Sequence, residues 1–164
     1  MNAGTEVGAI WDVVESVKLL LPHGGTVDVG PEEVIIGYRS AALPAHSVVL
    51  EATLWAEGGS SLEVRQEVRH LYRCRRESQP LSWPNAGSIF KNPPGERAGR
   101  LIDQLGLKGY QIGDAQVSRK HANFIVNCGQ ASVGDVLALI EYVKCHVQAR
   151  TGILLEEEVR IVGE

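Results

Sequence analysis

Residues 77–97 divide the sequence, because this stretch is rich in proline, glycine, serine and asparagine and shows no sustained hydrophobic period. Pro93 and Pro94 stop a helix, while Gly87 lets the backbone come close to a ligand. A long aperiodic segment inside a compact chain is typically a linker or a functional loop. We therefore predict two subdomains whose boundary lies within this stretch, beside a binding loop.

The chain has 164 residues, 44% hydrophobic and 22% charged, which suits one compact domain or two small ones. A net charge of −4 provides no basic face, so we expect no nucleic-acid partner. The longest uncharged apolar run, around residues 19–22, is too short to cross a bilayer, and the first residues do not resemble a signal peptide. We expect no membrane partner and a cytoplasmic location.

The three cysteines, Cys74, Cys128 and Cys145, are widely spaced and form no Cys-x-x-Cys pair. This spacing indicates neither a disulfide framework nor a zinc site. We expect reduced cysteines, mostly packing residues, and no metal.

The hydrophobic pattern predicts strands before the linker and mixed elements after it. A turn at residues 22–25 joins the first two strands as a hairpin, and Ser60 with Glu63 forms a capping-box pattern for a helix. The expected elements of the first part are strands over 13–21, 26–29, 34–37 and 47–56 and a helix over 61–75. Those of the second part are a helix over 98–105 ended by Gly106, a strand over 122–126, a helix from Ser132 to Gly152 and a strand over 153–162.

Three polar side chains of the central loop, those of Ser88, Lys91 and Asn92, form a candidate site on irregular backbone. Ser88 lacks a Gly-x-Ser-x-Gly context and an evident His–Asp partner, so a hydrolytic nucleophile is not indicated. It could instead donate a proton to a strongly basic carbanion through a hydrogen-bond relay. The alternative is a turn serine that bonds its own backbone, which the residues alone favour.

Tyr38 and Arg39 follow the apolar run 34–37, so Arg39 would leave the end of a strand. Its planar guanidinium could bind a carboxylate there, although a solvated surface arginine is the simpler interpretation. His121 could bind a diphosphate or lie on the surface, and the second is favoured by the sequence alone.

The acidic run Glu156-Glu157-Glu158 lies in the last predicted strand. Alternation would point Glu157 away from Glu156 and Glu158, with Val159 and Ile161 anchored in the core. A glutamate held beside Arg39 could orient a carboxylate or polarise an enolate, whereas most acidic runs are simply solvated.

Four motifs in this order resemble one family, the flavoenzyme UDP-N-acetylenolpyruvoylglucosamine reductase. They are Gly37-Tyr38-Arg39-Ser40, Asn85-Ala86-Gly87-Ser88-Ile89-Phe90-Lys91-Asn92-Pro93, His121-Ala122-Asn123-Phe124 and Leu155-Glu156-Glu157-Glu158-Val159-Arg160. The lack of a long insertion after Arg39 resembles the shorter subtype of the family. The glycine-rich turns that hold the flavin diphosphate in this family are absent, so the chain resembles its C-terminal part. Glu157 stands where the family commonly has proline.

The resemblance implies an α+β fold, with the remainder of a flavin-binding α+β domain over 1–78 and a small α/β substrate-binding domain over 79–164. It implies reduction of the enolpyruvyl ether of UDP-N-acetylglucosamine to UDP-N-acetylmuramate in peptidoglycan precursor synthesis, with FAD and NADPH as cofactors and a monomeric complete enzyme. The implied roles are enolate stabilisation for Arg39 and Glu158, protonation of C2 for Ser88, and substrate contacts for Tyr38, Lys91, Asn92 and His121.

Two alternatives remain open. One is a flavin-free fragment that binds a UDP-sugar and carries out no redox chemistry on its own. The other is an RNA-binding α+β domain built around the basic residues 73–76, which ranks last because aromatic residues make up only 5% of the chain.

Overall fold

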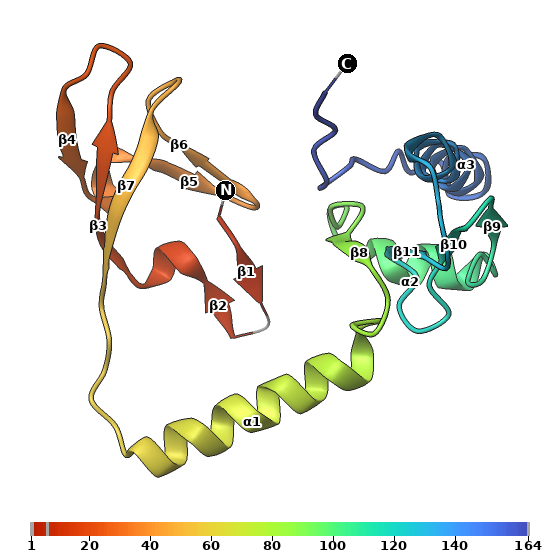
Figure 1. Cartoon of the computed structure of the whole chain (residues 1–164), viewed down its shortest axis with the longest axis horizontal. Helices are drawn as coiled ribbons and strands as arrows, with labels where there is room; N and C mark the ends of the chain where they lie inside the picture. The colour runs from red at the N-terminus through yellow and green to blue at the C-terminus, as the bar shows by residue number, and fades with distance from the viewer. Residues whose placement is uncertain (1, 6, 164) are drawn as a thin grey trace. The chain divides into compact units, whose positions relative to one another are not determined.

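The computed structural model describes residues 2–5 and 7–163 of the chain. It contains two compact units, Met1–Ser60 and Ser61–Glu164, which are described separately below (Figure 1). The described strand pairs are all antiparallel, and three α-helices accompany them, which confirms the predicted α+β class. The predicted functional division after residue 78 stays a prediction.

The first unit is built on a three-stranded sheet in the order β4-β3-β7. Its strands are β3 Val14–Leu20, β4 Thr26–Val29 and β7 Val48–Leu54. β3 and β4 form the predicted hairpin, and Gly24, at φ 88°, allows the chain to turn between them. The core consists mainly of apolar residues of β3 and its neighbours: Trp11, Val14, Val17, Leu19, Val29 and Val34. All seven residues of β7 are exposed.

Two small hairpins complete the first unit. They are β1 Gly4–Thr5 with β2 Gly8–Ala9, and β5 Ile35–Gly37 with β6 Ser40–Ala42. Short 3-10 helices, η1 Ile10–Asp12 and η2 Pro31–Glu33, connect the elements. The β5–β6 hairpin is closed by a two-residue turn, Tyr38 and Arg39, because Gly37 pairs directly with Ser40.

The second unit combines three helices with a four-stranded sheet in the order β8-β11-β10-β9. The helices are α1 Ser61–Ser78, α2 Ala98–Gln104 and α3 Val133–Thr151. The strands are β8 Asn85–Ser88, β9 Gln111–Ile112, β10 Ala115–Val117 and β11 Phe124–Asn127. The central residues of α3 pack in the core with Phe90, α2 and the sheet.

Local sequence signals explain how α2 and α3 begin and end. Ser132 and Asp135 form the predicted capping box, in which each side chain accepts a hydrogen bond from the other residue's backbone N–H. Gly152 ends α3 at φ 74°, and Gly106 follows α2 at φ 71°, both in the left-handed conformation that glycine adopts without strain. The three predicted helices are therefore confirmed, and α1 extends to Ser78.

Several predictions for the second unit are wrong. The strand predicted over 153–162 does not form, and this segment makes only one isolated bridge, between Phe90 and Glu157. The loop region 77–97 contains β8, which was not predicted, and β9 and β10 were also missed. The sheet of this unit is antiparallel, so the unit is α+β and not the small α/β domain that we expected.

Candidate functional site

Ser88 ends β8 and is half-buried, with its backbone in register with Phe124 of β11. The next residue, Ile89, donates its backbone N–H to the carbonyl of Asn123 at 2.9 Å. Gly87 has φ 83°, and an added Cβ at this position would meet no described atom within 4 Å. The backbone before Ser88 therefore needs glycine for its conformation, and the space beside it is open.

The C-terminal segment brings Glu158 next to this loop. The Glu158 N–H donates to the carbonyl of Ile89 at 2.7 Å, and the Lys91 N–H donates to the carbonyl of Glu156 at 2.8 Å. Between these bonds, Phe90 and Glu157 form a β-bridge. Ile89 thus connects Ser88 and Glu158: Ser88 is its covalent neighbour, and Glu158 is its backbone hydrogen-bond partner.

The three glutamates of this segment have different surroundings. Glu156 Oε2 lies 3.0 Å from Lys91 Nζ, and Glu157 Oε1 lies 2.6 Å from Nζ of Lys144 on α3. The pKa of Glu157 is lowered, chiefly by the hydrogen bond from Lys144, and the pKa of Lys144 is raised chiefly by the same bond. The Lys91 ammonium, which lies on the same loop as Ser88, is therefore engaged with Glu156. Glu158 is half-buried.

The anchors expected for this segment are partly wrong. Val159 is half-buried and packs against the core, but Ile161 is 63% exposed and anchors nothing. Leu155, at 1% exposure, is the residue that fixes the segment in the core.

Two asparagines hold the loop in place, and sequence reasoning assigned a role to only one of them. Asn92 Oδ1 accepts a hydrogen bond from the Ala98 N–H at the start of α2, at 3.1 Å. Asn123 accepts from the Phe90 N–H at 3.0 Å through Oδ1 and donates to the Phe90 carbonyl at 2.8 Å through Nδ2. Asn123 and Phe90 are both buried, so the backbone N–H and carbonyl of Phe90 need partners inside the protein. The Asn123 side chain provides the two hydrogen bonds that a neighbouring strand would otherwise provide.

His121 lies on the loop between β10 and β11, half-buried against Phe124 in an edge-to-face contact at 4.9 Å. Its Nδ1 accepts a hydrogen bond from the Asn123 N–H at 3.2 Å. Burial, and secondarily the charge of Lys108, lower the pKa of His121, so the ring is neutral at pH 7. With Nδ1 as acceptor, the proton of the neutral ring is on Nε2, which can donate to an anion.

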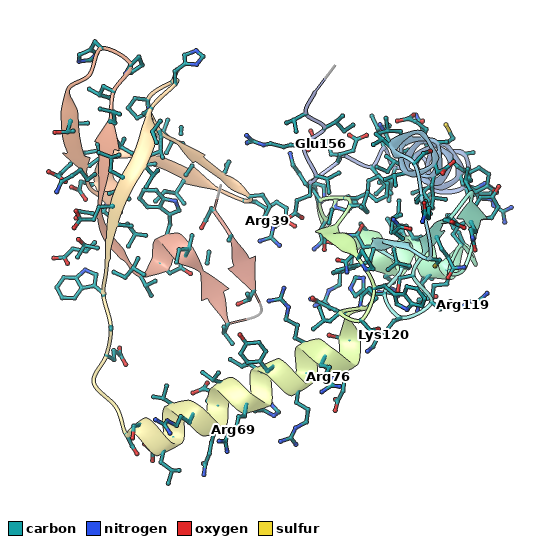
Figure 2. The ribbon with its side chains drawn as sticks, viewed as in Figure 1. Arg39, Arg69, Arg76, Arg119, Lys120 and Glu156 are labelled. Carbon is teal, nitrogen blue, oxygen red and sulfur yellow. The ribbon has the colours of Figure 1, made fainter. Side chains whose placement is uncertain are left out.

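A hollow of about 350 Å³ lies beside the C-terminal end of α1 and is lined by Arg76, Leu81, Ser82 and Lys120. Figure 2 shows Arg76 and Lys120 at this end of the helix, where Lys120 Nζ donates to the Arg76 carbonyl at 2.5 Å. Two cationic side chains and a hydroxyl suit a phosphate-bearing ligand. Sequence reasoning missed this set; the signals were the basic residues 73–76 and the pair Arg119-Lys120.

Arg39 and Tyr38 belong to the first unit, at the turn between β5 and β6. Arg39 has φ 55°, its Nη1 donates to the Gly4 carbonyl at 2.8 Å, and its Cζ lies 5.5 Å from the centre of the Tyr38 ring. A left-handed conformation costs a residue with a Cβ about 1 kcal/mol and is enriched at functional sites. The proposed action of Arg39 together with Glu158 stays a prediction, because these residues lie in different units.

Within the described part of the chain, no three histidine, cysteine or acidic side chains are placed to hold a metal ion. None of the described helices is both long enough and apolar enough to cross a bilayer.

These features define an α+β domain in which Ile89 is the covalent neighbour of Ser88 and the backbone partner of Glu158, with cationic side chains in the same unit. The family model described as the C-terminal domain of UDP-N-acetylenolpyruvoylglucosamine reductase matches residues 79–162. The chain therefore belongs to the UDP-N-acetylenolpyruvoylglucosamine reductase family.

Individual relatives agree with this assignment. The reductase of Thiobacillus denitrificans is 48% identical over all of this chain and 51% of its own length, and reductase 2 of Symbiobacterium thermophilum is 46% identical over 99% of the chain and 53% of its own length. The crystal structure of the reductase from Thermus caldophilus matches 98% of the chain and 57% of that protein, with a TM-score of 0.84 and 40% identity. The chain thus spans about half the length of the relatives that it matches.

Proposed function

We propose that this chain supplies the substrate-binding and proton-donating part of an enzyme that reduces UDP-N-acetylenolpyruvoylglucosamine to UDP-N-acetylmuramate. The observation that carries the proposal is the backbone hydrogen bond from the Glu158 N–H to the carbonyl of Ile89, the residue that follows Ser88, in the region that the family model matches. The reaction would serve peptidoglycan precursor synthesis in the cytoplasm.

We infer that the residues that hold the flavin diphosphate lie mainly in the half of the relatives that this chain does not match. Binding of this group requires glycine backbone left open to the phosphates. In the first unit, Gly30 and Gly37 are closed by the side chains of Glu32 and Ser40, whereas Gly24 and Gly58 are open. In the complete enzyme, FAD reduced by NADPH would supply the hydride. The roles proposed for this chain concern the substrate alone.

Hydride addition at C3 of the enolpyruvyl group leaves negative charge at C2 and on the adjoining carboxylate, and a proton must reach C2. Ser88 would donate this proton, while Arg39 and Glu158 would stabilise the enolate. A serine hydroxyl is a weak acid, so its position must be fixed before the carbanion forms. The pairing of Ser88 with β11 and the bond between Ile89 and Glu158 support such preorganisation.

Binding of the sugar nucleotide would rely on Tyr38, Lys91, Asn92 and His121. The neutral His121 ring can donate a hydrogen bond from Nε2, and the hollow beside α1 adds the cations of Arg76 and Lys120 for a diphosphate. Residues 79–164 would form the substrate-binding domain and residues 1–78 the rest of the flavin-binding domain, in an enzyme that acts as a monomer.

A second candidate is a UDP-sugar-binding fragment without redox activity. It is favoured by the family match, which covers the region of Ser88 and Glu158 while the chain spans about half of its relatives.

Titration of the full chain with FAD, then NADPH, then the enolpyruvyl sugar nucleotide separates the two candidates. Bound flavin that is bleached by NADPH and reoxidised by the sugar nucleotide would establish the reductase in this chain. Sugar-nucleotide binding without flavin binding would support the second candidate. If the sugar nucleotide does not bind, both are wrong.

A further inference from the structure

Lys144 connects the C-terminal segment to the longest packed helix of the second unit. Its ammonium lies 2.6 Å from Glu157 and 3.1 Å from Glu141, which lies on the same helix. The side chains of Lys144 and Glu157 are 20% and 29% exposed, so this pair is more sheltered than Lys18–Glu51, where the exposures are 41% and 65%. A sheltered pair is screened less by water and salt.

The C-terminal segment is held in the core by the side chains of Leu155 and Val159, but it forms no strand. Among the described residues, its backbone pairs only with Ile89, Phe90 and Lys91 of the loop. Lys144 adds a side-chain contact to a separate element, α3. The side chain of Glu156 bonds to Lys91, which belongs to the same loop as Ser88, so this pair lets segment and loop move together. By contrast, α3 is fixed in the core by buried residues on both sides of Lys144: Leu139, Ile140, Val143 and Val147.

The position of Glu158 follows from that of Glu157. The bridge between Phe90 and Glu157 sets which residue reaches Ile89, and a shift by one residue would exchange the directions of neighbouring side chains. A tether on Glu157 to an independent rigid element therefore opposes such a shift.

We propose that Lys144 is a positioning residue, which holds Glu157 against α3 and thereby fixes Glu158 relative to Ser88. This role rests on the proposed function of Ser88 and Glu158. Lys144 does not touch the substrate; it acts through Glu157 on the backbone of the segment.

Site-resolved amide hydrogen exchange of the full chain, measured by NMR, tests the proposal. The variants are Lys144→Met, which removes the charge and keeps the aliphatic stem, Glu157→Gln and the double variant. Lys144→Arg tests rescue by a conserved charge, and Lys18→Met is a matched control that breaks an ion pair in the first unit. The reporters are the Glu158 amide, whose bond to Ile89 would loosen, and the Val143 amide in α3.

We expect Lys144→Met to speed exchange at Glu158 by about fivefold to tenfold while Val143 changes little, because only the tether is lost. Glu157→Gln should have a similar effect, the double variant should add nothing, and Lys144→Arg should restore most of the protection. An unchanged Glu158 amide in Lys144→Met would overturn the proposal, and so would equal acceleration at Glu158 and Val143, since that reports loss of global stability.

Addition of the enolpyruvyl sugar nucleotide to the same samples separates this proposal from the proposed function. We expect the Glu158 amide signal of the wild type to shift on binding, and to shift less in Lys144→Met. If the wild type shows no binding while Lys144→Met still loosens Glu158, the proposed function fails and the tether itself stands.

Discussion

Replacement of Asn123 by alanine tests whether one buried side chain holds the candidate loop. Asn123 is 4% exposed and Phe90 is 2% exposed, and the carboxamide satisfies both the N–H and the carbonyl of Phe90. Asn123→Ala would leave two buried backbone groups without this partner, each at a cost of about 1–3 kcal/mol. A water molecule that enters the space of the lost amide would recover part of this cost. We therefore expect the free energy of unfolding to fall by about 2–4 kcal/mol.

Urea unfolding followed by far-ultraviolet circular dichroism measures this change, because all three α-helices lie in the second unit. Gln116→Ala is a suitable control: its side chain bonds to Gln111 at an exposed position of the same sheet, and its loss should cost less than about 0.5 kcal/mol. If Asn123→Ala costs no more than this control, the Phe90 backbone is not held by the side chain, and the account of the loop is wrong.

Three further predictions concern α3 and the candidate site. Gly152→Ala should lower the free energy of unfolding by about 1 kcal/mol in the same urea assay, because alanine is strained at φ 74°; an unchanged value would argue against the left-handed cap. Because the pKa of His121 is lowered in the folded chain, the stability contributed by the neutral ring is complete at a pH above the unfolded pKa of about 6.5. This stability declines as the pH falls from 6.5 towards the folded pKa. An NMR titration of the ring that finds an ordinary or raised pKa would contradict this. Glu158→Gln should lower turnover far more than affinity for the sugar nucleotide, as measured by steady-state kinetics and calorimetry in a flavin-competent enzyme, because its carboxyl group is proposed to act on the developing enolate; equal losses in both would contradict the role.

Elements with strong local signals were predicted from the sequence. The capping box at Ser132 and the glycine at position 152 define α3 within a residue at each end, and the turn at residues 22–25 defines the β3–β4 hairpin. These signals depend on neighbours within four residues, so the sequence alone contains them.

Elements that depend on distant partners were missed or wrong. β8 has the sequence Asn-Ala-Gly-Ser, which has no strand propensity, and forms because β11 pairs with it. The strand predicted over 153–162 has a suitable alternation but finds a single bridge instead of a strand partner, since Glu156 and Glu158 bond to an irregular part of the loop. β9 and β10 contain two and three residues, too few to show a period.

The residues of the candidate site show the same difference between local sequence signals and distant contacts. Ser88, Lys91, Asn92 and Glu158 are candidates because they lie in motifs that resemble a family, and their roles stay predictions. Asn123 and Lys144 received no role, because their importance lies in contacts with Phe90 and Glu157, 33 and 13 residues away along the chain. A motif shows which residue types are present but not which side chains hold them in place.

The left-handed turn at Arg39 has a consequence for how this position responds to selection. Glycine or asparagine is the usual residue at the second central position of such a turn, and either would relieve about 1 kcal/mol of strain. A library randomised at position 39 and selected for folding alone should therefore become enriched in these two residues. A library selected for growth that depends on the complete reductase should retain arginine, so the difference between the two enrichments would measure what the guanidinium contributes beyond the fold.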